Sequence, residues 1–175
     1  MISALLLSLL IAQPLTEAER AEHNYYPFWE QHCEWVAKQK VSIADAAARL
    51  DSRGEDDRIG AALDMACFGE NAKPYIPKMI RTFTSRHGEN QSIGQSAVVH
   101  LGEIAVPFLI KALDDPDPDI RDHSIWALKF IGLKAKPALA PLKALQGKKG
   151  YNPDSLRRAI DAIEGKDIHT FYYPQ

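Results

Sequence analysis

The 175-residue sequence lacks most features that mark an enzyme, a membrane protein or a nucleic-acid-binding protein. Its formal net charge is only −2, so we predict no general attraction to nucleic acid. Its most apolar stretch, residues 4–12, is too short to span a bilayer. Only two cysteines are present, which excludes a disulfide-rich scaffold.

Motifs for metal binding and catalysis are also missing. The histidines are scattered and none forms His-x-x-x-His, so we predict no metal and no cofactor. No Gly-x-Ser-x-Gly and no phosphate-binding glycine loop occurs. Asp115, Asp117 and Asp119 alternate as in a calcium loop, but the glycine and bidentate glutamate of an EF-hand are absent. We therefore predict a protein that is not an enzyme.

What the sequence does contain is one motif repeated three times. Gly-x-x-Ala-x-Pro begins at Gly69, Gly102 and Gly132, with spacings of 33 and 30 residues. Apolar residues at helical spacing precede and follow each copy. Glycine ends a helix readily, and proline suits the first turn of the next one. Each unit is thus predicted to be a helix, a tight turn and a second helix, and Gly165, another 33 residues on, ends a half-unit.

The third unit resembles a HEAT repeat, particularly the short bacterial HEAT-like type. The resemblance rests on Asp119-Ile120-Arg121, Ala127-Leu128, Ile131-Gly132 and Pro137-Ala138-Leu139. Arg58 and Arg121 each lie 11 residues before their glycine, where this family tends to carry arginine, whereas Gln91 stands there in the second unit. The resemblance covers roughly residues 55–165. It implies an all-α solenoid of about three repeats, with N-terminal capping helices and a C-terminal half-repeat.

These patterns divide the chain into four parts. We assign residues 1–18 to a signal peptide, 19–54 to an N-terminal helical cap, 55–165 to the repeats and 166–175 to an aromatic tail. An amphipathic helix is expected over 27–40, and Ser42 with Asp45 forms a capping box. Asp119 and Ser155 are expected to cap helices of the third and fourth units. The tail is expected to pack on the last helices or on a partner.

The N-terminal segment resembles a secretory signal, with candidate cleavage after Ala12 or Ala18. We therefore predict an exported protein, periplasmic or extracellular. The alternative is a retained N-terminal helix in a cytoplasmic protein, because the charged n-region is missing and residues 16–19 also form a capping box.

Cys33 and Cys67 are expected to pair if the chain is exported and their Cα atoms lie within about 7 Å. A bond would tie the N-terminal cap to the first repeat. The alternative is that each cysteine is a small apolar core residue.

Lysine and arginine recur on the second helices, which line the concave face in HEAT-like arrays. Lys78, Arg81, Lys111 and Lys143 form a candidate basic row there, and the alternative is ordinary solvated side chains. The predicted function is a non-enzymatic scaffold that binds a protein or peptide on this face. The alternative is an accessory or lyase-like enzyme factor with a ligand in the solenoid groove. The partner and the oligomeric state stay open.

Overall fold

The computed structural model describes residues 27–84 and 88–166, with side chains described for 28–83 and 93–166. Regular structure in these residues is entirely helical, which confirms the all-α prediction. The predicted signal segment and residues 167–175 of the tail lie outside the described residues. The α-helices are α2 (Pro27–Lys38), α3 (Ile43–Arg49), α4 (Glu55–Ala66), α5 (Ile76–Ile80), α6 (Gly88–His100), α7 (Val106–Ala112), α8 (Pro118–Ile131), α9 (Leu139–Leu145) and α10 (Pro153–Ile163). The 3₁₀ helices are η2 (Gly69–Tyr75), η3 (Arg81–Thr84), η4 (Gly102–Ile104) and η5 (Gly132–Ala138).

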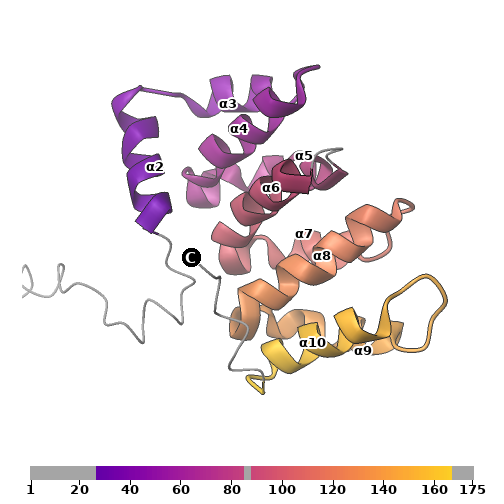
Figure 1. Cartoon of the computed structure of the whole chain (residues 1–175). Helices are drawn as coiled ribbons and strands as arrows, with labels where there is room; N and C mark the ends of the chain where they lie inside the picture. The colour runs from indigo at the N-terminus through magenta and orange to yellow at the C-terminus, as the bar shows by residue number, and fades with distance from the viewer. Residues whose placement is uncertain (1–26, 85–87, 167–175) are drawn as a thin grey trace, which may run out of the picture.

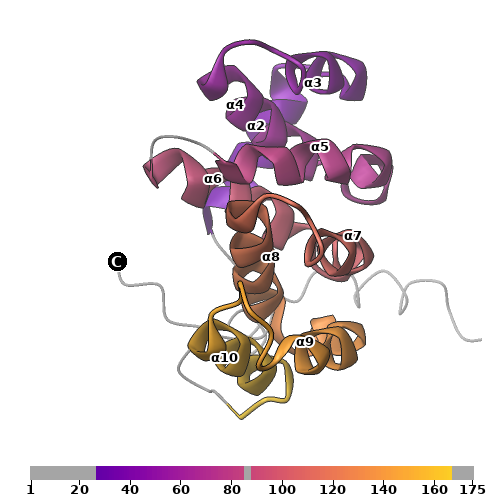
Figure 2. The same ribbon diagram turned by 90° about the vertical axis from the view of Figure 1, so that its right-hand side faces the viewer.

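The helices after α3 lie in two rows (Figures 1 and 2). In the first-helix row, α4, α6, α8 and α10 follow one another, and each contacts the next. In the second-helix row, α5 contacts α7, and α7 and α9 both contact η5. One continuous core of buried aliphatic side chains fills the space between the rows, and it includes Leu109, Ile125, Leu128 and Leu142.

Each passage from the first row to the second begins at a glycine with a left-handed backbone. The φ angles of Gly69, Gly102 and Gly132 are 53°, 58° and 63°. This conformation costs glycine little, so the predicted helix ends are confirmed. The segment that follows is a 3₁₀ helix rather than a tight turn. The α-helix begins just after the motif proline in the first and third units, at Ile76 and Leu139, but just before it in the second unit, at Val106.

The starts of α8 and α10 differ from the sequence expectation. Asp117 caps α8 in place of Asp119, and its Oδ1 accepts a hydrogen bond from the Asp119 N–H at 2.9 Å. Asn152 caps α10 in place of Ser155, and its Oδ1 accepts from the Ser155 N–H at 3.1 Å. In both helices the cap directly precedes a proline at the first helical position, where a missing N–H has no cost.

Arginines in the first and third units donate hydrogen bonds to the loop that precedes their own first helix. Arg58 Nη1 donates to the carbonyls of Ser52 and Arg53 at 2.8 and 3.0 Å, just before α4. Arg121 Nη1 donates to two carbonyls of the loop after α7, at 2.8 and 3.1 Å. Each arginine therefore fixes the chain that enters its own first helix. The side chain of Gln91 lies outside the described side chains.

The N-terminal cap consists of α2 and α3, which both contact α4 (Figure 1). The predicted capping box is confirmed: the Asp45 N–H donates to Ser42 Oγ at 3.1 Å, and the Ser42 N–H donates to Asp45 Oδ2 at 3.2 Å. Trp29 of α2 is buried against the end of α6. None of the described helices has the length and apolar character needed to cross a membrane.

Candidate functional site

Three of the four members of the predicted basic row are bound to carboxylates, and the first two are Lys78 and Arg81. Lys78 of α5 has its Nζ 2.5 Å from Asp51 Oδ2, in the loop after α3. Arg81 of η3 donates through both guanidinium Nη atoms to the carboxylate of Asp115, in the loop after α7. This pairing holds the pKa of Asp115 below its ordinary value. Both cations are thus compensated within the protein.

The other two members differ from each other. Lys143 of α9 has its Nζ 2.5 Å from Glu164 Oε1 at the end of α10. Hydrogen bonds from Lys143 and then from Lys166 lower the pKa of Glu164 to about 2. Lys111 of α7 is exposed and makes no ion pair with the described residues.

The three pairs share a position in the fold. Each joins elements that belong to successive units: the cap to the first unit, the first unit to the second, and the third to the half-unit. The predicted row therefore lies on the second-helix side. Three of its four cations form ion pairs that link successive units, so their charge is already compensated. Lys111 alone keeps the expected character of a solvated cation in this set of four.

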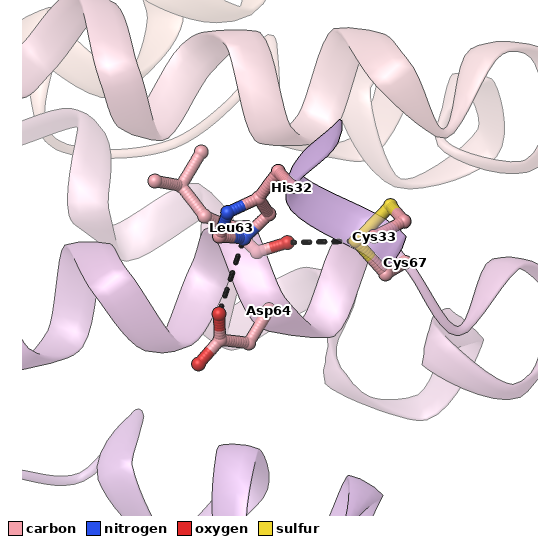
Figure 3. The surroundings of a disulfide bond; sticks show 5 residues. All are labelled: His32, Cys33, Leu63, Asp64 and Cys67. Carbon is pink, nitrogen blue, oxygen red and sulfur yellow. Dashed lines mark hydrogen bonds and ion pairs between the residues drawn. A yellow bond between two sulfur atoms is a disulfide. The ribbon is translucent and has the colours of Figure 1, made fainter. Parts of the chain in front are cut away.

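A second cluster surrounds the two cysteines (Figure 3). Cys33 of α2 and Cys67 at the end of α4 are bonded, with their Cα atoms 5.3 Å apart. This separation meets the geometric condition for the predicted disulfide. The bond ties the cap to the first unit, as the sequence argument requires.

Beside the disulfide lies a charged group that the sequence did not indicate. His32 Nε2 lies 3.1 Å from Oδ1 of the buried Asp64, close enough for an ion pair when the ring is protonated but not aligned as a hydrogen bond. Arg49 donates to Asp64 Oδ2 at 2.6 Å and to Asp57 Oδ1 at 2.7 Å. Arg49 thereby compensates the buried carboxylate, so we interpret this cluster as a structural link between α2, α3 and α4.

Aromatic rings continue from this cluster along α2. The rings of Phe28 and Trp35 each lie nearly parallel to that of His32, with centroids 5.5 and 5.9 Å away, and the two residues are 48% and 50% exposed. Trp29 instead stacks at 4.1 Å on the ring of His100 from α6. Although His100 as a residue is exposed, burial of its ring and the neighbouring His32 lower its pKa.

The described surface is hollowed between α8 and α10. This α8–α10 groove has a volume of about 320 Å³. Its lining combines cationic, aromatic, aliphatic and hydroxyl side chains with one carboxylate: Asp122, His123, Ile125, Trp126 and Lys129 from α8, and Ser155 and Arg158 from α10. Five of the seven lining residues are polar or charged, and Ile125 and Trp126 supply the apolar part.

His123 at this groove is held by a neighbouring helix. Its Nδ1 contacts the amide nitrogen of the buried Gln95 on α6, and its ring meets that of Phe83 in a T-shaped contact. An amide nitrogen donates, so Nδ1 accepts and Nε2 carries the proton of the neutral ring. Burial lowers the pKa of His123, partly opposed by nearby aspartates. The ring is therefore a neutral hydrogen-bond donor of fixed orientation.

The sequence did not single out this groove. In the sequence, Lys129 adds positive charge in the region of the candidate basic row, and His123 is one of the scattered histidines. The signal that it offered was local: Trp126 and Lys129 lie one helical turn apart on α8, beside His123. The contribution of α10 depends on packing between helices far apart in sequence.

Within the described residues, no group of three or more His, Cys, Asp or Glu side chains converges as metal ligands would. No protein-family model matches the chain, and no curated protein matches it. The functional argument therefore rests on the residues of this chain.

Proposed function

We propose that this protein is an exported, non-enzymatic HEAT-like solenoid that binds a partner protein or peptide. The solenoid assignment is supported by the repeated left-handed glycines and by the equivalent contacts of Arg58 and Arg121. The two rows of helices, with contacts between successive units, agree with a stack of helical hairpins.

The observation that carries the binding function is the α8–α10 groove. It presents a flat aromatic side chain and cationic groups in a hollow of about 320 Å³. The second-helix side, our first expectation for the binding face, offers Lys111 but has committed Lys78, Arg81 and Lys143 to internal ion pairs. We therefore place the principal binding surface at the groove.

Export is supported by the bonded cysteines. Disulfides persist in oxidising compartments and are rare in the cytosol of most organisms, and Cys33 and Cys67 are bonded. Mass spectrometry of the native protein is expected to find a mature N-terminus at Gln13 or Glu19. Recovery of the cytosolic protein with Met1 intact contradicts this assignment.

Site-specific photocrosslinking tests the binding function. A benzoylphenylalanine at position 126 in the groove is expected to trap a defined partner in native cells, which then binds the purified chain. The same amino acid at position 111 tests the second-helix face. Absence of a specific crosslink at both positions contradicts the binding function.

The second candidate is an accessory or lyase-like enzyme factor that holds a small ligand. The groove is the observation in its favour, because its volume is at the lower end of small-molecule sites. Native mass spectrometry of protein purified from its source distinguishes the candidates. A stoichiometric small molecule that is lost on mutation of the groove supports the second.

A further inference from the structure

We propose that the α8–α10 groove binds an acidic peptide segment of the partner, with a carboxylate side chain next to an aromatic one. This inference rests on the proposed binding function and names the chemistry of its ligand. The carboxylate would lie between Lys129 and Arg158, and the aromatic ring on Trp126.

The charges of the groove favour a single carboxylate. Lys129 and Arg158 reach it from different helices, and Asp122 is the only carboxylate in its lining. Ammonium and guanidinium groups bind carboxylates through charge-assisted hydrogen bonds, which are the stronger kind. Asp122 would repel a phosphate dianion more than a carboxylate, so the lining favours an Asp or Glu side chain over a phosphorylated ligand.

The two neighbouring arginines of α10 are used differently. Arg157 forms ion pairs with Asp154 at 3.1 Å and with Asp161 at 3.9 Å, along its own helix. Arg158 lines the groove, is exposed, and makes no ion pair with the described residues. Arg158 is therefore available to a ligand, and Arg157 provides a matched control on the same helix.

The floor of the groove accounts for the aromatic part of the ligand. Ile125 is buried, and the half-buried Trp126 packs on Phe130 with ring centroids 4.0 Å apart. This contact orients the Trp126 ring before any ligand arrives. A second aromatic ring gains both apolar burial and stacking on such a surface.

His123 supplies a neutral donor at the same place. Because Gln95 occupies Nδ1, the Nε2–H is the hydrogen-bond donor that remains on the ring. A peptide carbonyl or carboxylate oxygen is the matching acceptor. The groove volume of about 320 Å³ suits two side chains and the backbone between them, not a folded domain.

The test is a nuclear magnetic resonance titration of the full chain with two capped tripeptides. One is acetyl-Phe-Glu-Phe-amide and the other replaces Glu by Gln. The Trp126 indole signal, identified with Trp126→Phe, is expected to shift with the Glu peptide. The Gln peptide is expected to bind about tenfold more weakly, the factor that about 1.4 kcal/mol produces.

Variants assign the effect to the groove. Arg158→Ala is expected to weaken binding of the Glu peptide about tenfold, whereas Arg157→Ala leaves it within about twofold. Asp122→Asn removes the repelling carboxylate and is expected to tighten binding. Arg157 and Arg158 are both exposed, so circular dichroism of both variants is expected to match the parent.

Several results overturn the inference. Equal binding of the Glu and Gln peptides does so, as does an equal effect of the two arginine variants. Free N-acetylphenylalanine binding as tightly as the Glu peptide assigns the groove to small acids instead. If a partner crosslinked in cells binds Arg158→Ala as tightly as the parent, this inference fails while the proposed binding function stands.

Discussion

Leucines near the end of α8 differ in burial, and this difference predicts their contribution to stability. Leu128 is fully buried in the core, whereas Leu133 in η5 is 42% exposed. Leu128→Ala is expected to lower the free energy of unfolding by roughly 2–5 kcal/mol, because it removes buried methyl groups and leaves a cavity. Leu133→Ala, measured by the same urea denaturation, is expected to cost much less. A loss below about half a kcal/mol for Leu128→Ala contradicts its place in the core.

His123 predicts a dependence of stability on pH. Its pKa is lowered in the folded state, chiefly by burial, so the unfolded chain takes up the proton first as pH falls. Its contribution is complete above the ordinary histidine pKa of about 6.5 and is lost as pH falls through the lowered folded-state value. The free energy of unfolding is expected to decrease between pH 7.5 and 5.5, and to decrease less in His123→Gln.

The free energy of unfolding of His123→Gln is still expected to depend on pH, because of His100. His100 also has a lowered pKa, so it contributes in the same direction and over the same range. Equal slopes for the parent and His123→Gln contradict the assignment. A direct measurement of the His123 ring signals decides whether its pKa lies below that of the unfolded chain.

Single residues also show what local sequence can and cannot predict. The capping box at Ser42 was predictable, because both of its members lie within four residues. Asp117 and Asn152 were also within reach, since an Asp or Asn directly before a proline suits a helix start. The link between His32 and Asp64 was not, because the two lie on different helices whose packing no local pattern states.

At the scale of elements, α6 packs closely on η3 at Gly94. A Cβ added at Gly94 of α6 would overlap the Thr82 hydroxyl and lie 3.4 Å from the Thr82 carbonyl oxygen. That hydroxyl is buried and donates to the Met79 carbonyl at 2.6 Å, so it does not move away freely. The absence of a side chain at position 94 is therefore what allows the two elements to pack.

Gly94→Ala is expected to destabilise the protein by about 1–3 kcal/mol, as overpacking does, despite the better helix propensity of alanine. Thermal or urea unfolding measures the loss. Thr82→Ala in the same chain removes the overlapping group, so the double variant is expected to recover part of it. Additive losses in this double-mutant cycle contradict a direct clash.

The sequence predicted the helices and where the first helix of each unit ends, but not the lengths of the second helices. The repeated motif located each helix end at its glycine, because that signal is local. It did not predict the 3₁₀ helices η2 and η5, or that α5 would have only five residues. The motif proline does not fix those lengths, since it precedes α5 and α9 but lies inside α7.

For the whole molecule, the disulfide joins the cap to the first unit. The bond between Cys33 and Cys67 closes a loop with a sequence separation of 34. In the chain-entropy account such a loop contributes about 3–4 kcal/mol by restricting the unfolded chain. The double variant Cys33→Ala/Cys67→Ala is expected to lose about this amount relative to the oxidised parent, measured by urea denaturation.

Two further measurements test whether the bond itself is responsible for this loss of stability. Reduction of the parent with dithiothreitol is expected to reproduce the loss, which separates the bond from the alanine substitutions. Two freely alkylated cysteines in unreduced protein from the native compartment contradict the bond there, and they also weaken the case for export.

The fastened cap has a consequence for how the molecule comes apart. Helices at the end of a row have a packed neighbour on one side only, so we expect a row to open from its ends. At the N-terminal end, the disulfide holds α2 to α4, and the Trp29–His100 stack reaches α6 as well. At the other end, α10 has only non-covalent contacts with α8, α9 and η5. We therefore expect unfolding by heat or force to begin at α10 and to proceed toward the N-terminal helices.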